Sequence, residues 1–362
     1  MINILQGNCL DKLKELPDQS INTCITSPPY WGLRNYGDDK QLGLEDTPEE
    51  YVDNLVKVFK EVKRVLRNDG TVWLNLGDCF LSNKQLGLIP FKVAIALQQD
   101  NWILRQDIIW HKPNPMPESV RDRCTKAHEY IFLLSKSTKY YFDNEAIKED
   151  SVTSTKQQIK KRNKFYRKNA KGTEEKYLKQ NFANDKYKDK VFQKRNKRSV
   201  WTITTKPFKR AHFATFPMDL IEPCVLAGCP EKVCIDCGTP YQRITSRKSD
   251  PLKVNDSTLD RYGNGKAGVH RKIGGQYYKW LSENPLITVG WEKQCSCETN
   301  ETKSGTVLDH FAGSGTTGIV ANNHNRNAVL IELNAEYIEI ARERIEEQGN
   351  LFCDYEIEWS EN

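Results

Sequence analysis

The sequence predicts an open, mostly parallel α/β sheet that carries two insertions. Apolar strands alternate with amphipathic helices at both ends of the chain, and a glycine-rich turn joins one of the last strands to its helix. Length adds a third observation. A chain of 362 residues with 38% hydrophobic side chains buries a full core, either as one large domain with insertions or as two domains.

Composition narrows the class of protein. No segment approaches the roughly 20 apolar residues of a membrane span, and the first residues lack the basic-then-apolar layout of a signal peptide. We therefore expect a cytoplasmic protein without a membrane partner. In that reducing compartment, we expect the 11 cysteines to be metal ligands where they cluster and core residues elsewhere.

The first part of the chain supplies strands and helices in alternation. Short apolar runs predict the strands, and apolar residues at three-to-four spacing predict the helices. In chain order they are a strand at 21–27, a helix at 49–69, a strand at 71–78, a helix at 88–100, and strands at 102–112 and 127–137. The helix at 49–69 is expected to stop at Gly70.

The last part of the chain, 305–348, predicts a strand, a glycine turn, a helix, a strand and a second helix. In open parallel sheets, ligands bind at the carboxyl ends of the strands. The glycine turn and the stretch TSPPYW at 26–31 both fall at such strand ends. Both are therefore candidates for one functional site.

The glycine turn has the spacing of a nucleotide-type cofactor loop. Gly313, Gly315 and Gly318 form a G-x-G-x-x-G pattern, and Glu332 ends the next strand. Small residues allow a ligand to approach the backbone, and an acid there accepts hydrogen bonds from both hydroxyls of a ribose. The pattern serves nicotinamide dinucleotides and S-adenosylmethionine alike, and it also occurs as an ordinary tight turn. No Lys-Ser or Lys-Thr pair follows the glycines, which argues against a phosphate-cradling loop.

TSPPYW at 26–31 and VLDHFAGSGTTG at 307–318 together resemble the catalytic and cofactor motifs of the amino-group DNA methyltransferases, which make N4-methylcytosine or N6-methyladenine. The catalytic motif comes first here, as in the circularly permuted beta group of that family. Similar segments extend over most of the chain outside about 151–198 and 238–294. The resemblance implies a Rossmann-like methyltransferase sheet, S-adenosyl-L-methionine as cofactor, and double-stranded DNA as partner.

The chemistry of the proline pair supports this resemblance. An exocyclic amine on a base is a poor nucleophile because its lone pair is delocalised into the ring, so it needs hydrogen-bond acceptors. The Ser27 hydroxyl and the Pro28 carbonyl supply acceptors, and the ring-locked φ angles of Pro28 and Pro29 hold them still. Tyr30 would stack on a base extruded from the duplex. The alternative is an ordinary proline-terminated strand with Tyr30 in the core.

The resemblance assigns roles to further positions. It places Asp309 at the methionine end of the cofactor and Glu332 at the ribose, and it places the segment HFATFP at 212–217 against the cofactor. Asn8 stands where the family usually has an acid, and His310 stands where it often has proline. Asp78 is expected to border the pocket. The cofactor set implied in this way is Asn8, Phe213, Thr215, Phe216, Pro217, Asp309, Phe311, Ala312, Gly313, Gly315, Thr316, Thr317 and Glu332.

Residues 151–198 form a basic insertion with interleaved aromatic side chains. Lysine and arginine neutralise phosphates while aromatics lie near bases, so this insertion is a candidate target-recognition region, with Lys160, Lys161 and Arg162 as phosphate contacts. The alternative is a solvated, partly flexible linker.

Residues 229–297 form a second insertion, bracketed by cysteines. Cys234 and Cys237 form a C-x-x-C knuckle that Cys295 and Cys297 would complete as a tetrahedral thiolate set for a structural zinc, with Cys229 as a substitute ligand. The alternative is a chance grouping of reduced cysteines.

These observations predict five segments: two halves of a methyltransferase domain at 1–150 and 298–362, the two insertions, and a cofactor-pocket segment at 199–228. Two other classes remain open. A dinucleotide-dependent oxidoreductase explains only the glycine turn, and a noncatalytic zinc-containing DNA-binding protein explains only the insertions. The sequence is compatible with a homodimer and with a companion restriction endonuclease, and it fixes neither the target site nor the target base.

Overall fold

A computed structural model describes residues 1–33, 41–150, 194–205, 216–247, 284, 286–348 and 353–359 of the chain. The chain folds into two compact units. The first comprises Met1–Ile147, Arg198–Gln242 and Lys293–Asn362, and the second comprises Lys148–Lys197 and Arg243–Glu292. Among the described residues, no helix combines the length and the apolar character needed to cross a membrane.

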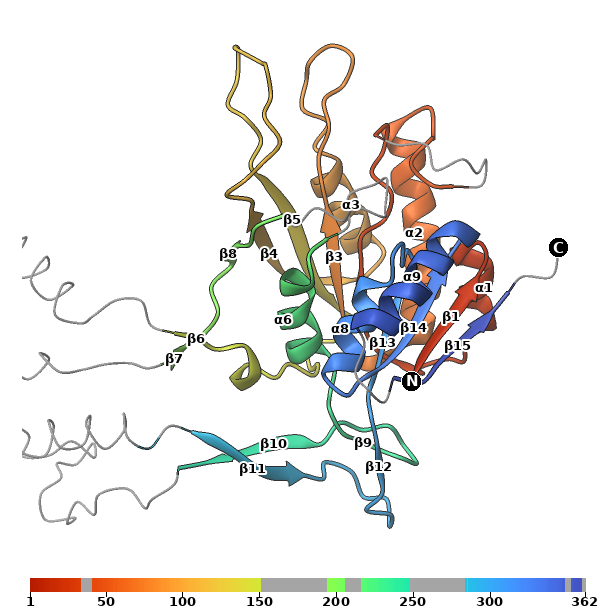
Figure 1. The fold of residues 1–362 in the computed structure, drawn as a ribbon, viewed down its shortest axis with the longest axis vertical. Helices are drawn as coiled ribbons and strands as arrows, with labels where there is room; N and C mark the ends of the chain where they lie inside the picture. The colour runs from red at the N-terminus through yellow and green to blue at the C-terminus, as the bar shows by residue number, and fades with distance from the viewer. Residues whose placement is uncertain are drawn as a thin grey trace, which may run out of the picture. The chain divides into compact units, whose positions relative to one another are not determined.

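The first unit is built on a nine-stranded sheet in the order β15-β1-β14-β13-β2-β3-β5-β4-β8 (Figure 1). Its strands are β1 (Ile2–Gln6), β2 (Ile21–Thr26), β3 (Leu66–Leu76), β4 (Ile103–His111), β5 (His128–Ser135), β8 (Val200–Thr202), β13 (Thr306–Asp309), β14 (Asn327–Glu332) and β15 (Tyr355–Glu358). All neighbours pair in parallel except β5, which is antiparallel to both β3 and β4. The predicted mostly parallel α/β sheet is therefore confirmed.

Helices cover both faces of this sheet (Figure 1). They are α1 (Cys9–Glu15), α2 (Pro48–Val65), α3 (Ile89–Gln99), α6 (Met218–Gly228), α8 (Thr316–Asn323) and α9 (Ala335–Gln348), with a short 3-10 helix at Glu145–Ile147. One core cluster contains side chains of α1, α2 and α3, and the other contains side chains of α6, α8 and α9. Successive strand residues alternate between the clusters, as with Val72 and Trp73 of β3, because side chains of a strand point to opposite faces.

Helix α2 ends earlier than the sequence suggested. Thr47 caps its start by accepting a hydrogen bond from the Glu50 backbone N–H at 3.2 Å, and Pro48 opens its first turn. The helix stops at Val65, not at Gly70, because Leu66 is drawn into β3 and pairs with Ile21. Leu66 is fully buried there, so tertiary pairing overrides the local helical pattern.

The central strands form a topological switch point. From β13 the chain passes through α8 to β14 on one side, whereas from β2 it passes through α2 to β3 on the other. Strands β13 and β2 are themselves neighbours, with Leu308 opposite Cys24. Their carboxyl ends therefore meet where ligands bind in sheets of this kind.

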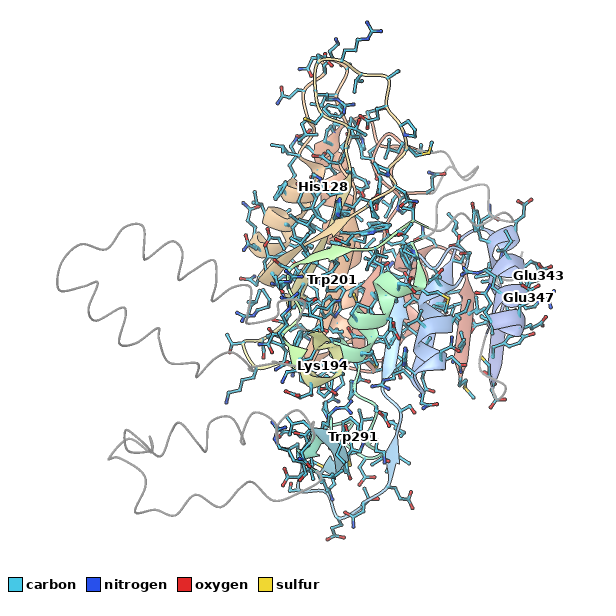
Figure 2. The ribbon with its side chains drawn as sticks, turned by 60° about the vertical axis from the view of Figure 1, so that its left-hand side comes forward. His128, Lys194, Trp201, Trp291, Glu343 and Glu347 are labelled. Carbon is cyan, nitrogen blue, oxygen red and sulfur yellow. The ribbon has the colours of Figure 1, made fainter. Side chains whose placement is uncertain are left out.

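Small two-stranded sheets complete the described structure. In the first unit, β9 (Val233–Cys234) pairs with β12 (Thr302–Lys303). In the second unit, β6 (Glu149–Asp150) pairs with β7 (Lys194–Arg195), and β10 (Gln242–Ser246) pairs with β11 (Ile287–Glu292). There the Arg243 guanidinium lies 4.5 Å from the centre of the Trp291 ring, which Figure 2 labels.

Candidate active site

A cavity of about 750 Å³ lies at the carboxyl ends of the central strands of the first unit. Residues 27–30, after β2, line it together with residues 311–314, after β13. Glu332 of β14 and Asn8, after β1, line it as well. The two motifs, some 280 residues apart in the sequence, thus share one cavity at the switch point.

On the cofactor-motif side, Glu332 holds the glycine turn in place. One carboxylate oxygen accepts the Gly313 N–H at 2.7 Å, and the other accepts the Asn334 N–H at 2.9 Å. Burial raises the pKa of Glu332. Gly313 has a φ of +51°, and a Cβ built there would meet no protein atom within 4 Å, so its backbone faces open space. A ligand can approach this turn closely.

Asp309 is fully buried behind the turn and does not line the cavity. Its carboxylate accepts hydrogen bonds from Thr26 Oγ1 at 2.8 Å, Thr317 Oγ1 at 2.6 Å and the Phe311 N–H at 3.2 Å. Burial raises its pKa to about 6. Asp309 therefore ties the end of β2 to the end of β13 and to the start of α8, which holds the two motifs in register.

The predicted cofactor residues separate into two groups. Asn8, Phe216, Phe311, Ala312, Gly313, Thr316 and Glu332 line the cavity. Pro217, Asp309, Gly315 and Thr317 do not line it. Pro217 precedes α6, and Gly315 has a φ of +74° that lets α8 begin against Ala341. Phe213 and Thr215 lie outside the described residues.

On the catalytic-motif side, neighbouring elements hold the proline pair. Tyr51 of α2 donates its hydroxyl to the Pro29 carbonyl at 2.8 Å. The Tyr30 ring packs against Gly77, where a Cβ would come within 2.5 Å of the ring. The Tyr30 hydroxyl accepts from Asn75 Nδ2 at 2.7 Å and donates to Glu129 at 2.9 Å. The proline pair and Tyr30 thus form a rigid wall of the cavity.

Sequence reasoning missed the polar cluster beside the proline pair, whose members Asn75, Lys112 and Glu129 also line the cavity. Asn75 of β3 donates to Ser27 Oγ at 3.3 Å and to Glu129 at 3.0 Å, and Glu129 forms an ion pair with Lys112. The Lys112 ammonium lies 4.2 Å from the centre of the Trp110 ring. One signal was available: Asn75 interrupts the apolar run of β3, and a polar residue in a buried strand needs a partner.

Asp78 does not lie where we expected. Its carboxylate accepts the Cys79 N–H at 2.9 Å and the Ile89 N–H at 3.0 Å, so it satisfies the start of α3. It does not line the main cavity, although it lines a second cavity of about 690 Å³. Asn8 likewise caps a helix, because its side-chain oxygen accepts the Leu10 N–H at 2.9 Å.

The sequence profile of the N6/N4 DNA methylase family matches residues 21–260 and 295–343, most of the chain. The chain belongs to this DNA methylase family. The methylase is 34% identical over 372 residues to the Type II methyltransferase M.Cfr9I of Citrobacter freundii, covering 95% of this chain and 87% of that relative. It is 33% identical over 370 residues to the Type II methyltransferase M.SmaI of Serratia marcescens, covering 94% and 90%.

Solved structures share the fold of the methylase. The PvuII DNA methyltransferase, which is cytosine-N4-specific, superposes with a TM-score of 0.54 at 17% identity, covering 97% of this chain and 86% of that chain. A Thermus thermophilus protein, solved in complex with S-adenosyl-L-methionine, superposes with a TM-score of 0.50 at 20% identity, covering 99% of both chains. At these identities the likeness concerns the fold alone.

Four cysteines of the methylase come together away from the cavity. The sulfur atoms of Cys234, Cys237, Cys295 and Cys297 all lie within 4.8 Å of one another. Gly238, with a φ of +67°, closes the C-x-x-C turn by donating its N–H to the Cys234 carbonyl at 2.9 Å. Both cysteine pairs belong to the first unit. Lys160, Lys161 and Arg162 of the methylase lie outside the described residues.

Proposed function

We propose that this DNA methylase transfers a methyl group from S-adenosyl-L-methionine to the exocyclic amine of a base taken out of double-stranded DNA, with N4 of cytosine as the target. One observation carries the proposal: the proline motif and the glycine turn line the same cavity. The curated relatives, named as Type II methyltransferases, support this chemistry. A dinucleotide oxidoreductase or a noncatalytic binding protein would leave the proline motif without a role.

The glycine turn suits the proposed cofactor. The open space at Gly313 accommodates a ligand against the backbone, and Glu332 would accept hydrogen bonds from ribose hydroxyls. Phe311 and Ala312 would complete the loop, with Thr316, Phe216 and Asn8 at the cavity wall. Asp309 is a positioning residue, since it contacts the cavity only through its neighbours. S-adenosyl-L-methionine, when bound, supplies a methyl group activated by its positively charged sulfur.

The proline motif suits the amine. The Ser27 hydroxyl and Pro28 carbonyl would accept hydrogen bonds from the amine and turn its lone pair toward the methyl group. The nitrogen lone pair would form the new N–C bond while the electrons of the broken C–S bond return to sulfur, and the amine would release one proton to water. Positioning supplies most of the rate, and the Tyr51 and Asn75 hydrogen bonds keep the acceptors in place.

The choice of base rests on Ser27. In the amino-methyltransferase family, a serine at this position most often accompanies N4-cytosine methylation, whereas aspartate or asparagine accompanies N6-adenine methylation. A neutral hydroxyl accepts from either amine, so N6 of adenine is the alternative, with the same mechanism. The outcome for the base does not affect the role of the cavity.

The cysteine cluster supports a structural zinc. Four thiolates are a preferred donor set for Zn²⁺, and each would bind at about 2.3 Å in a tetrahedral site. The sulfur separations, all within 4.8 Å, are compatible with that geometry. All four positions are cysteines, with no site left open for a reacting ligand, which is typical of a structural and not a catalytic zinc.

Analysis of methylated nucleosides tests the proposed function. DNA isolated from cells that express the protein should contain N4-methylcytosine, detected by mass spectrometry of its nucleosides. Ser27→Ala should reduce methyl transfer strongly with little change in cofactor affinity, whereas Glu332→Ala and Gly313→Val should weaken cofactor binding in calorimetry. N6-methyladenine alone would overturn the choice of base. A finding of 5-methylcytosine alone would overturn the target atom and the mechanism, because methylation of the ring carbon needs a covalent nucleophile.

A further inference from the structure

Met116 lies exposed at the rim of the cavity that the proline motif and the glycine turn share. Its relative exposure is 85%, yet it lines the cavity together with Pro115 and Pro117. The prolines fix the backbone on both sides, so the side chain has few ways to fold back onto the protein. Its position at the mouth of the cavity places this apolar side chain where it can contact a substrate that enters.

The loop that carries Met116, residues 112–127, is anchored at its foot. The Lys112 N–H donates to the Ala127 carbonyl at 2.8 Å, which closes the loop. Asn114 exchanges two hydrogen bonds with the Thr205 backbone, at 3.1 and 3.0 Å. In Figure 1 the loop rises beyond the ends of β4 and β5, and Figure 2 labels His128 where the loop rejoins the sheet.

The side of the loop is anchored as well, and its charge suits DNA. The Arg123 guanidinium lies 4.1 Å from the centre of the Phe80 ring, and Lys126 donates to the Asp78 carbonyl at 2.6 Å. The loop carries four basic and two acidic side chains, and with Glu129, which pairs with Lys112, the sum is one positive charge. A net positive rim attracts the phosphate backbone and brings the duplex over the cavity.

We propose that Met116 is a wedge that enters the DNA duplex at the position from which the target base leaves. Removing a base from the stack costs a few kcal/mol, and a side chain that fills the gap offsets that cost. Methionine and proline are among the residues that proteins insert between base steps. Methionine is also unbranched and polarizable, so it fits an irregular gap. This inference rests on the proposed function.

The test separates base extrusion from the chemical step. It uses duplexes that contain the recognition site found by methylation mapping, with the target base either paired or opposite an abasic sugar. With the paired target, Met116→Ala should lower kcat/KM by about tenfold or more. With the abasic partner no pair has to be broken, so Met116→Ala should act almost as well as the parent. Met116→Leu should keep most of the parent activity on both.

Controls keep the outcomes distinct. Val120→Ala removes an apolar side chain of 39% exposure from the same loop, outside the cavity, and should leave both rates unchanged. A 2-aminopurine beside the target base should brighten with the parent protein and less with Met116→Ala. Equal losses on both duplexes, or no loss, would overturn the wedge while leaving the proposed function standing. A parent protein that methylates no DNA would instead overturn the proposed function, and the wedge with it.

Discussion

Asp309 shows what a single residue contributes to this site. A carboxylate with no exposure to solvent is costly, and three hydrogen bonds from Thr26, Thr317 and the Phe311 backbone offset only part of that cost. The rise of its pKa to about 6 reflects the remainder. The charge is kept at the one point where β2, β13 and α8 meet, so it serves alignment at the expense of stability.

The stability of the protein should therefore depend on Asp309 in a definite direction. Its folded pKa of about 6 lies above its usual value of 3.8, so the stabilisation is present below pH 3.8 and lost as the pH rises through about 6. The amide of an Asp309→Asn variant would not titrate. In urea unfolding, the stability of Asp309→Asn relative to the parent should rise between pH 4 and pH 7 by up to about 3 kcal/mol. A difference that stays constant or falls with pH would contradict this.

Sequence reasoning at this scale succeeded where chemistry is local. Gly313 and Glu332 were found because a turn and the next strand lie close together in the chain, and the structure brings them to 2.7 Å. Asn75, Lys112 and Glu129 come from three separate segments of the chain, and no local pattern links them. Asp78 was assigned to the pocket by its strand-end position alone, whereas the start of α3 competes for its carboxylate.

At the scale of elements, the cysteine knuckle is joined to the main sheet. The Arg67 guanidinium of β3 donates to the Cys237 carbonyl at 3.0 Å, and Cys234 of β9 pairs with Thr302 of β12. The knuckle therefore contacts the same strand that carries Asn75 at its other end. A metal that orders the knuckle would also stabilise this end of β3.

Purified protein should accordingly contain about one zinc per chain, measured by elemental analysis. Cys234→Ser and Cys237→Ser should each lose the metal and lower the unfolding temperature by about 5 °C or more. Cys124→Ser is the matched control, because Cys124 is an exposed free cysteine outside the cluster. Metal-free parent protein of undiminished stability would rule the site out.

Element types were easier to predict than their ends. The strand, turn and helix order of 305–348 appears in the structure as β13, α8, β14 and α9. The end of α2 was wrong because Leu66 suits a helix and a buried strand equally well, and pairing with Ile21 decides between them. The orientation of β5 was not evident either, since a buried apolar run does not record which way a strand runs.

For the whole molecule, DNA binding should draw on the basic insertion. If it contacts phosphates, replacing Lys160, Lys161 and Arg162 together by glutamine should weaken DNA binding and reduce the slope of log K against log salt by up to about 2.7. Lys14, Lys57 and Lys60 are exposed on α1 and α2, and their triple glutamine variant is a charge-matched control. Equal slopes for the parent and the insertion variant would favour the linker interpretation.

The overall sheet could be predicted from alternation, but its strand order could not. Adjacent strands such as β13 and β2 are separated by about 280 residues, and no local pattern specifies such a pairing. The same holds for the cavity, whose walls come from both ends of the chain and from the middle. The motif resemblance predicts that the two ends of the chain form one site. In the structure, the pairing of β13 with β2 brings these ends together.

The position of β1 has a consequence for synthesis of the protein. Both of its neighbours in the sheet, β14 and β15, begin after residue 326, so β1 cannot pair until about 320 further residues have been synthesised. Until then Ile2, Ile4 and Leu5 lack the partners that bury them. During synthesis the unpaired apolar residues of β1 are therefore a site of possible aggregation. The cavity is incomplete over the same interval, because Glu332, at the end of β14, forms part of its wall.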